Sequence, residues 1–247
     1  MLEELKKIAR EAGDAILQYY HDDIEVTNKE DDSPLTKADI AAHNCIVDGL
    51  EAMNTGIPII SEEAELPDYQ TRKDWNKFWL VDPLDGTKEF IKKNGEFTVN
   101  IALISNGEPE IGVVFLPAKN VMYTGSRSEG SFKVENGRIE QIYSEKADKN
   151  KPLSVITSRS HKADDLEDQL KEKGIKISKI VQAGSSLKFC FVAEGKADIY
   201  PRTGPTMEWD VAAGDAVYRY SSAEAPHKSP LTYNKENLKN EGFLIGF

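Results

Sequence analysis

Cysteine and long apolar runs are scarce in this sequence, and their scarcity excludes several classes of protein. The 247 residues include only two cysteines, Cys45 and Cys190, so a disulfide-stapled fold is excluded and a thiolate zinc site is disfavoured. No run of ~18 apolar residues is present, and the charged N-terminal segment lacks the apolar core of a secretory signal. The sequence therefore predicts a cytoplasmic protein without an integral membrane anchor. Peripheral attachment at the inner face of a membrane stays open.

Several motifs of nucleotide-binding and nucleophilic enzymes are also missing. The sequence has no Walker-type phosphate loop, no G-x-G-x-x-G after a strand and no G-x-S-x-G elbow, and its four histidines form no H-E-x-x-H pair. Acidic residues outnumber basic ones by 42 to 31, which gives a formal charge of −11. That charge disfavours nucleic-acid polymers and anionic membranes as partners, and it also argues at first sight against a phosphate ester.

The spacing of apolar residues predicts helices first and then a run of strands. Residues 2–20 have helical spacing, and a second helix is predicted behind the capping signal Thr36-Lys-Ala-Asp39. Its apolar face comprises Ala38, Ala41, Cys45, Ile46, Leu50 and Met53. Strands are predicted at 56–60, 77–81, 97–104, 111–115, 121–125 and 131–134. Turn signals such as Asn106-Gly107 separate the later strands, and Asn136-Gly137 follows the last of them, which is typical of an antiparallel meander.

Helices and strands alternate in the second part of the chain. Strands are predicted at 153–157, 176–181 and 198–200, and helices at 162–173, 184–194 and 207–220. This alternation indicates a smaller α/β lobe after the charged, turn-like stretch 144–151. We therefore expect an α+β protein of layered helices and sheets, with an N-terminal lobe at 1–150 and a C-terminal lobe at 151–247.

Acidic residues stand at the ends of the predicted strands. Asp82 follows the strand 77–81, and Asp85 comes three residues later, in a turn that Pro83 and Gly86 enforce. With the carbonyl of Leu84, this turn offers three oxygen ligands, which suits a Mg²⁺ ion that keeps some of its water.

Three further acids are candidates for the same site. Glu62 ends another predicted strand, Asp210 lies near the start of the last predicted helix, and Asp31 lies in the loop before Ser33-Pro34. Two other interpretations of the turn at Asp82 stay open. It could be an Asx-turn with a helix cap, or the nucleophile loop of a phosphatase, although that chemistry uses Asp-x-Asp.

The longer motifs resemble a known family. Ser61-Glu-Glu63, Trp79-Leu-Val-Asp-Pro-Leu-Asp-Gly-Thr87 and Glu208-Trp-Asp-Val-Ala-Ala213 resemble the inositol monophosphatase superfamily of Mg²⁺-dependent, lithium-sensitive phosphatases. Asp85-Gly-Thr-Lys-Glu-Phe-Ile-Lys92 and Tyr200-Pro-Arg202 look like its CysQ-type 3′(2′),5′-bisphosphate nucleotidase branch. The resemblance implies a layered α-β-α-β-α sandwich, as in inositol monophosphatase and fructose-1,6-bisphosphatase.

The resemblance also implies roles for single residues. Those implied as ligands of two or three Mg²⁺ ions are Glu62, Asp82, Asp85, Asp210 and the carbonyl of Leu84. Asp31 and Thr87 match the pair that orients and deprotonates the attacking water. The implied substrate contacts are Gly86, Thr87, Ser158, His161, Gly184, Lys188, Arg202 and Asp210. Lys188 alone would be interpreted as a solvated helix lysine. Gly184-Ser185-Ser186 is predicted to begin a helix with free N–H groups that suit an anion.

The implied reaction removes the 3′-phosphate of adenosine 3′,5′-bisphosphate and yields AMP and phosphate, with the sulfated nucleotide PAPS, which would give APS, as a further substrate. An inositol or sugar monophosphatase of the same superfamily is an alternative, and a non-catalytic nucleotide- or metal-binding protein is another. The preferred substrate and the oligomeric state stay open. The negative net charge no longer excludes a phosphate ester, because Mg²⁺ ions would reverse the local field at the site.

Overall fold

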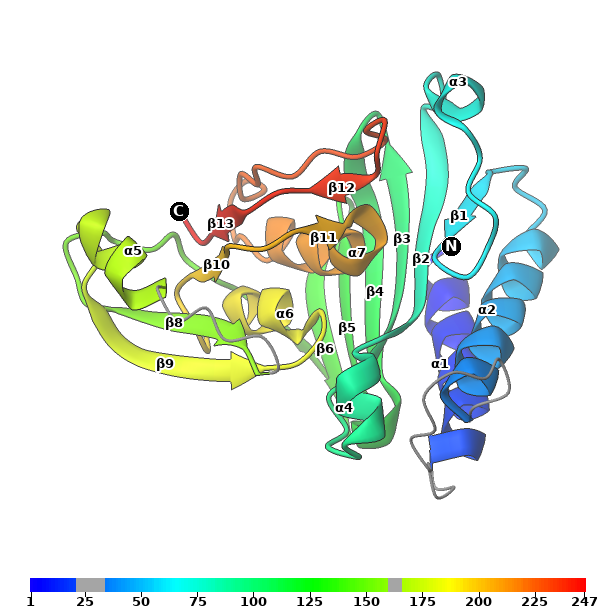
Figure 1. Ribbon diagram of the computed structural model, residues 1–247, viewed down its shortest axis with the longest axis horizontal. Coiled ribbons are helices and arrows are strands. Elements are labelled where there is room, and N and C mark those ends of the chain that lie inside the picture. Colours follow the sequence, from blue (N-terminus) through cyan, green and yellow to red (C-terminus); the bar gives the residue numbers. More distant parts are fainter. Residues whose placement is uncertain (21–33, 160–165) are drawn as a thin grey trace.

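The computed structural model describes residues 1–20, 34–159 and 166–247, and these residues form stacked layers of helices and sheets (Figure 1). Helices α1 (Leu2–Tyr20) and α2 (Pro34–Ala52) cover one face of a large sheet. Helices α6 (Leu187–Ala193) and α7 (Glu208–Arg219) lie on the opposite side, followed by a small sheet and then α5 (Leu166–Glu172). This order is the expected α-β-α-β-α sandwich.

Helix α1 packs on α2 and on the large sheet through one apolar face. Leu5, Ile8, Ala12 and Ile16 recur at helical spacing and are buried, while charged residues occupy the other face. The helix has the predicted bounds. Helix α2 begins at Pro34, two residues before the predicted capping signal, because proline suits the first turn of a helix. Its buried face includes Ala42 rather than Ala41.

The large sheet has seven strands in the described residues, and they lie side by side in chain order. They are β1 (Ile59–Ser61), β2 (Lys77–Asp85), β3 (Thr98–Ser105), β4 (Glu108–Leu116), β5 (Val121–Ser126), β6 (Gly130–Glu135) and β7 (Arg138–Gln141). Strands β1 and β2 are parallel, and all later neighbours are antiparallel. The meander is thus confirmed. A short helix, α3 (Tyr69–Arg72), connects β1 to β2, and α4 (Thr87–Ile91) and a 3₁₀ turn (Pro117–Lys119) lie in later connections.

Helix α7 lies directly against the backbone of the large sheet. A Cβ atom at Gly125 would come within 2.4 Å of the Ala216 carbonyl oxygen, and one at Gly112 within 2.5 Å of the Ala213 oxygen. Glycine at these two strand positions therefore allows a helix to approach the sheet more closely than a side chain would permit.

The small sheet and the C-terminal strands complete the fold. Strands β8 (Leu153–Ser158) and β9 (Ile177–Ala183) are parallel, and a bridge joins β8 to Ile199. The C-terminal pairs are β10 (Tyr200–Arg202) with β13 (Phe243–Ile245), and β11 (Thr206–Met207) with β12 (Lys239–Asn240). The sequence did not predict β7, β11, β12 or β13, which are short or lack an apolar pattern.

The hydrophobic core joins the two parts of the chain. One cluster of buried residues includes Phe78 and Leu80 of β2 together with Phe189 of α6 and Val217 of α7. The two predicted lobes, 1–150 and 151–247, would thus share a core, and their boundary stays a prediction. None of the described helices is long and apolar enough to cross a bilayer.

Candidate metal centre and active site

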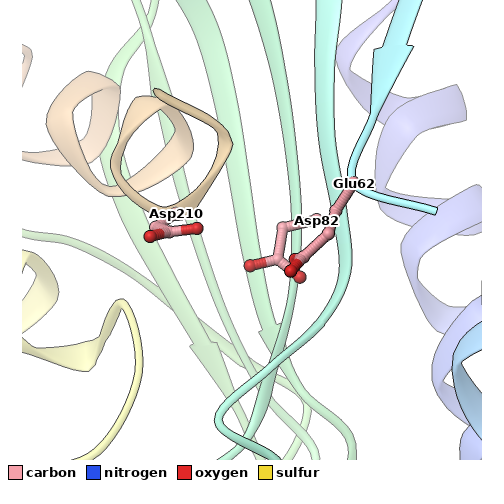
Figure 2. A group of neighbouring side chains, drawn as sticks. All are labelled: Glu62, Asp82 and Asp210. Atoms are coloured by element: carbon pink, nitrogen blue, oxygen red, sulfur yellow. The ribbon is translucent and has the colours of Figure 1, made fainter. Parts of the chain in front are cut away.

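Carboxylates from three separate elements converge at one edge of the large sheet. Glu62 follows β1, Asp82 lies in β2, and Asp210 is in the first turn of α7. Oxygen atoms of these side chains all lie within 4.8 Å of one another, and Figure 2 shows the three groups pointing into the same space. We call Glu62, Asp82 and Asp210 the carboxylate trio. Three of the five acids expected at one site thus lie together in the described residues.

Parallel pairing of β1 and β2 brings the first two acids together. Ser61 pairs with Val81, and the Glu62 amide N–H donates to the Val81 carbonyl oxygen at 3.1 Å, so both acids follow the same rung of the ladder. The pairing of β2 with β3 then becomes irregular between Asp82 and Asp85, because Pro83 has no N–H to donate. The backbone turns there, and the Leu84 amide N–H donates to the Asp82 carboxylate at 3.1 Å.

Asp210 is held by its own helix terminus. Its carboxylate accepts the Met207 amide N–H at 2.9 Å and so caps α7, where a negative charge also interacts favourably with the helix dipole. The same side chain therefore starts the helix and completes the trio.

Proximity and burial make the trio bind protons readily. Burial, with the charges of Asp85 and Glu62, raises the pKa of Asp82 well above its ordinary value. Burial and the charge of Asp85 raise the pKa of Asp210 to about 7. Glu62 is the most exposed member, yet its carboxyl end lies against Asp82, and loss of hydration raises its pKa too. A set of oxygen ligands that repel one another is the donor set of a hard divalent cation, so the residues present fit Mg²⁺.

Asp85 lies close to the trio but outside its 4.8 Å limit. Its carboxylate accepts the Asn100 side-chain N–H at 3.4 Å. Burial raises the pKa of Asp85, and the charge of Lys188 and hydrogen bonds from Asn100 and Ser186 oppose that rise. Asp85 therefore has partners within the protein and connects the trio with the neighbouring cavity. Its role as a ligand, like that of the Leu84 carbonyl, stays a prediction.

One acid beside the trio, Asp39, is not among the predicted site residues. Burial, with the charges of Glu63 and Glu62, raises the pKa of Asp39 to about 8, and the charge of Asp39 in turn acts on Asp82. Asp39 lies on α2, next to the buried Ala38. The position of Asp39 beside the apolar face of a helix is a sequence signal for a buried acid. The motif Thr36-Lys-Ala-Asp39 also has the form of a helix cap, which is the structure it predicts by itself. Asp31, the acid that was selected instead, lies outside the described residues.

A cavity of about 300 Å³ opens next to the trio, and Asp210 belongs to both. The expected site residues that line it are Asp85, Gly86, Thr87, Ser158, Lys188, Arg202 and Asp210. Ser185 and Ser186 of the predicted anion-binding turn also line it, as do Tyr200 and Thr206, which were not expected as site residues. Gly86 has a left-handed φ of 98°, and a Cβ atom there would meet the Phe97 Cα at 3.2 Å, so glycine is required. His161 lies outside the described residues.

Lys188 is a buried lysine rather than a solvated one, with 6% of its surface exposed. Its Nζ donates to the Ser185 carbonyl oxygen and lies 5.7 Å from the centre of the Tyr200 ring. Burial lowers the pKa of Lys188 to about 8, although the nearby charge of Asp85 opposes that shift. A cation of this kind faces the cavity with little water around it, so its interaction with an anion there is strong.

Gly184 does not offer the free amide that the sequence suggested. Its N–H donates to the Glu96 carboxylate at 2.9 Å, and Gly184 does not line the cavity. Helix α6 begins at Leu187 instead of 184, because Ser185 has a left-handed φ of 43° that ends helical geometry. The Arg202 guanidinium donates to the carbonyl oxygens of Gly204 and Pro205, both at 3.2 Å.

Comparison with known proteins gives the same family over most of the chain. Residues 1–220 match the inositol monophosphatase family. The chain is 47% identical to the 3′(2′),5′-bisphosphate nucleotidase CysQ of Escherichia coli (strain K12), and the match covers 99% of each chain. It is 31% identical to the protein of the same name from Haemophilus influenzae, over 99% of this chain and 92% of the relative.

A solved structure is similar along the whole chain. CysQ from Bacteroides thetaiotaomicron, described as a bacterial member of the inositol monophosphatase family, superposes with a TM-score of 0.81 and 41% identity. That match covers 98% of this chain and 95% of the other. Family match, relatives and fold agree, and the chain belongs to the inositol monophosphatase family.

Proposed function

We propose that the protein is a Mg²⁺-dependent phosphatase that hydrolyses the 3′-phosphate of adenosine 3′,5′-bisphosphate to AMP and phosphate. The observation that carries this proposal is the shared position of Asp210, which belongs to the carboxylate trio and also lines the cavity that contains Lys188 and Arg202. A phosphate group bound at the trio would leave the rest of a nucleotide inside that cavity. Full-length identity of 47% to an Escherichia coli 3′(2′),5′-bisphosphate nucleotidase supports the substrate class.

Two or three Mg²⁺ ions would be held by Glu62, Asp82, Asp85, Asp210 and the carbonyl of Leu84. Bound there, the metal supplies positive charge for the phosphoryl oxygens and lowers the pKa of a water molecule. The chain itself brings the oxygen ligands together at a buried sheet edge, and it holds Asp210 through the cap of α7. Lithium inhibition is expected from the same resemblance.

Thr87 and a nearby acid would orient the attacking water and accept its proton. Thr87 is the first residue of α4 and lines the cavity beside Gly86. We propose Asp39 for the acid in place of Asp31. A carboxyl group with a pKa of about 8, placed beside Glu62 and Glu63, is suited to accept a proton near neutral pH once a cation lowers that value.

Two variants test which acid, Asp39 or Asp31, accepts the proton of the attacking water. Asp39→Asn is expected to lower kcat by about 100-fold or more, as is usual when a general base is removed, with little change in KM. Asp31→Asn is expected to retain wild-type kcat. The reverse result would assign the role to Asp31, and metal affinity measured on both variants shows that the centre is intact.

The substrate would be bound by the residues around the cavity. Lys188 and Arg202 supply positive charge, and Ser158, Gly86 and Thr87 supply polar contacts. Gly184 contributes by shaping the turn before α6, and His161 is retained as a contact from the sequence resemblance.

A phosphate-release panel with Mg²⁺ tests the function. Adenosine 3′,5′-bisphosphate is expected to exceed inositol 1-phosphate and fructose 1,6-bisphosphate in kcat/KM by about 100-fold, since its base and 5′-phosphate would contact the residues that line the cavity. Lithium is expected to suppress the release, and PAPS is the further substrate to include. A preference for inositol phosphate would indicate the sugar-phosphatase alternative, and binding without turnover would indicate a non-catalytic protein. The cytoplasmic location stays a prediction, which cell fractionation tests.

A further inference from the structure

The C-terminal segment 233–240 contacts the connection that follows Glu62, and it contacts the first turn of α7, which contains Asp210. We propose that this segment sets the position of Asp210 relative to Glu62, through two buried side chains, Glu208 and Arg72. The proposal rests on the proposed metal site, and it assigns positioning roles to residues that bind neither metal nor substrate. We call the contacts between Glu208, Arg72 and segment 233–240 the C-terminal clamp.

Glu208 is the end of the clamp that is nearest to Asp210. It is the first residue of α7 and is fully buried, two positions before Asp210. Its carboxylate accepts the amide N–H groups of Asn234 at 2.7 Å and Lys235 at 3.0 Å, and it pairs with the Lys235 Nζ at 2.7 Å. Its own N–H donates to the Leu238 carbonyl oxygen at 2.8 Å. The first turn of α7 is thereby tied to the C-terminal segment.

Arg72 forms the other end of the clamp, in the connection that starts at Glu62. Only 2% of Arg72 is exposed, although it is an arginine. Its guanidinium donates to the Asn234 side-chain oxygen at 2.8 Å and to the carbonyl oxygens of Lys235 and Glu236 at 2.9 and 2.7 Å. The Asn234 side-chain N–H donates back to the Arg72 carbonyl oxygen at 2.8 Å.

The three links form one path between two members of the trio. Glu62 begins the connection that holds Arg72, Asn234 and Lys235 join Arg72 to Glu208, and Glu208 starts the turn that contains Asp210. Pairing of β11 with β12 adds a second tie just before α7, as Figure 1 shows. Packing against the sheet holds the body of α7, and the first turn is held by the clamp together with the Ser186 hydroxyl, which donates to the Asp210 carbonyl oxygen at 2.7 Å. Groups that hydrogen-bond directly to metal ligands typically change metal affinity by about 10–100-fold when removed, and the clamp acts one contact further out, so we expect the lower end of that range.

Binding of Mn²⁺ alone, measured by calorimetry without substrate, tests the clamp. Arg72→Lys removes the branched guanidinium that makes three hydrogen bonds to segment 233–240, and Glu208→Gln removes one acceptor oxygen and the charge that pairs with Lys235, so each is expected to weaken Mn²⁺ binding by about 10-fold. Arg219→Lys is the matched control. Arg219 is also a buried arginine and pairs with Asp215 at 2.9 Å on the same helix, and it reaches the C-terminal region at the Leu231 carbonyl oxygen and through the Tyr233 hydroxyl on Asp215, without contacting Glu208 or Arg72.

The control variant is expected to lose thermal stability and to bind Mn²⁺ within twofold of wild type. High Mg²⁺ is expected to restore kcat in the clamp variants, because the ligands themselves are intact. Lys235→Met, which removes one ion pair and leaves the backbone contacts, gives a milder variant should the others not fold. Equal Mn²⁺ affinity in wild type and in every folded clamp variant would overturn the proposal, as would equal weakening in Arg219→Lys.

Mn²⁺ binding and nucleotide hydrolysis test the clamp and the proposed function independently of each other. Wild-type protein that binds Mn²⁺ but hydrolyses no nucleotide would overturn the function and leave the clamp to be judged by affinity alone.

Discussion

Each carboxyl group at the metal centre is subject to two opposing effects on its protonation. These groups must be ionised to bind a cation, yet burial and mutual repulsion favour their protonated forms when no cation is bound. Raised pKa values mean that the metal-free protein holds protons that its unfolded chain releases. The contribution of Asp210 to the free energy of unfolding is therefore complete below the pKa of the unfolded chain, near 3.8. It is lost as the pH rises through the folded pKa of about 7.

Metal binding should accordingly release protons. At pH 6, where Asp210 is still largely protonated without metal, Mg²⁺ binding is expected to release on the order of one proton or more, and fewer at pH 8. Calorimetry in buffers with different ionisation enthalpies measures the number directly. The Asp210→Asn variant should release fewer protons, and a release that does not vary with pH would contradict the assigned pKa shifts.

Helices and strands position these side chains, and the close approach of α7 to the large sheet is the critical contact. Gly125→Ala is expected to lower the free energy of unfolding by about 1–3 kcal/mol, because its Cβ atom would collide with the helix backbone. Urea unfolding measures this change. Gly204→Ala is the control, since a Cβ atom at that glycine meets nothing within 4 Å. An unchanged unfolding midpoint for Gly125→Ala would mean that α7 can shift without cost.

Most of these elements could be predicted from the sequence, for physical reasons that differ between them. Helix α1 and strands β2 to β6 have clear apolar periods, because each buries a defined face. Strand β7 was missed because all four of its residues are exposed. The start of α6 was misplaced because the left-handed backbone of Ser185 has no residue-type signal.

The candidate site could be predicted only in part. Glu62, Asp82 and Asp210 were found because acids at the ends of apolar segments are conspicuous, and the family resemblance selected them. Asp39 was missed because its neighbour in space, Glu62, is in another element. The C-terminal clamp depends on pairing residue 72 with residues 234–236, which local patterns do not encode.

The whole molecule carries a formal charge of −11, which counts every carboxyl group of the trio as ionised. Without a divalent cation the trio offers a phosphate group no positive charge, because its carboxyl groups are protonated or, where ionised, negative. Binding of AMP is therefore expected to be undetectable by calorimetry in EDTA and measurable when Ca²⁺ is added, since Ca²⁺ also prefers oxygen ligands. Equal AMP affinity in the two conditions would show that Lys188 and Arg202 suffice to attract the nucleotide.

The position of the clamp has a consequence for biosynthesis. Glu62, Asp82 and even Asp210 leave the ribosome before the segment 233–240 that fixes their spacing. Contacts between residues this far apart in sequence form late, because loop closure must precede them. A nascent chain stopped just after residue 220 would therefore contain every carboxylate of the trio and still lack an ordered centre. We expect the growing protein to capture its metal only once synthesis has passed the clamp.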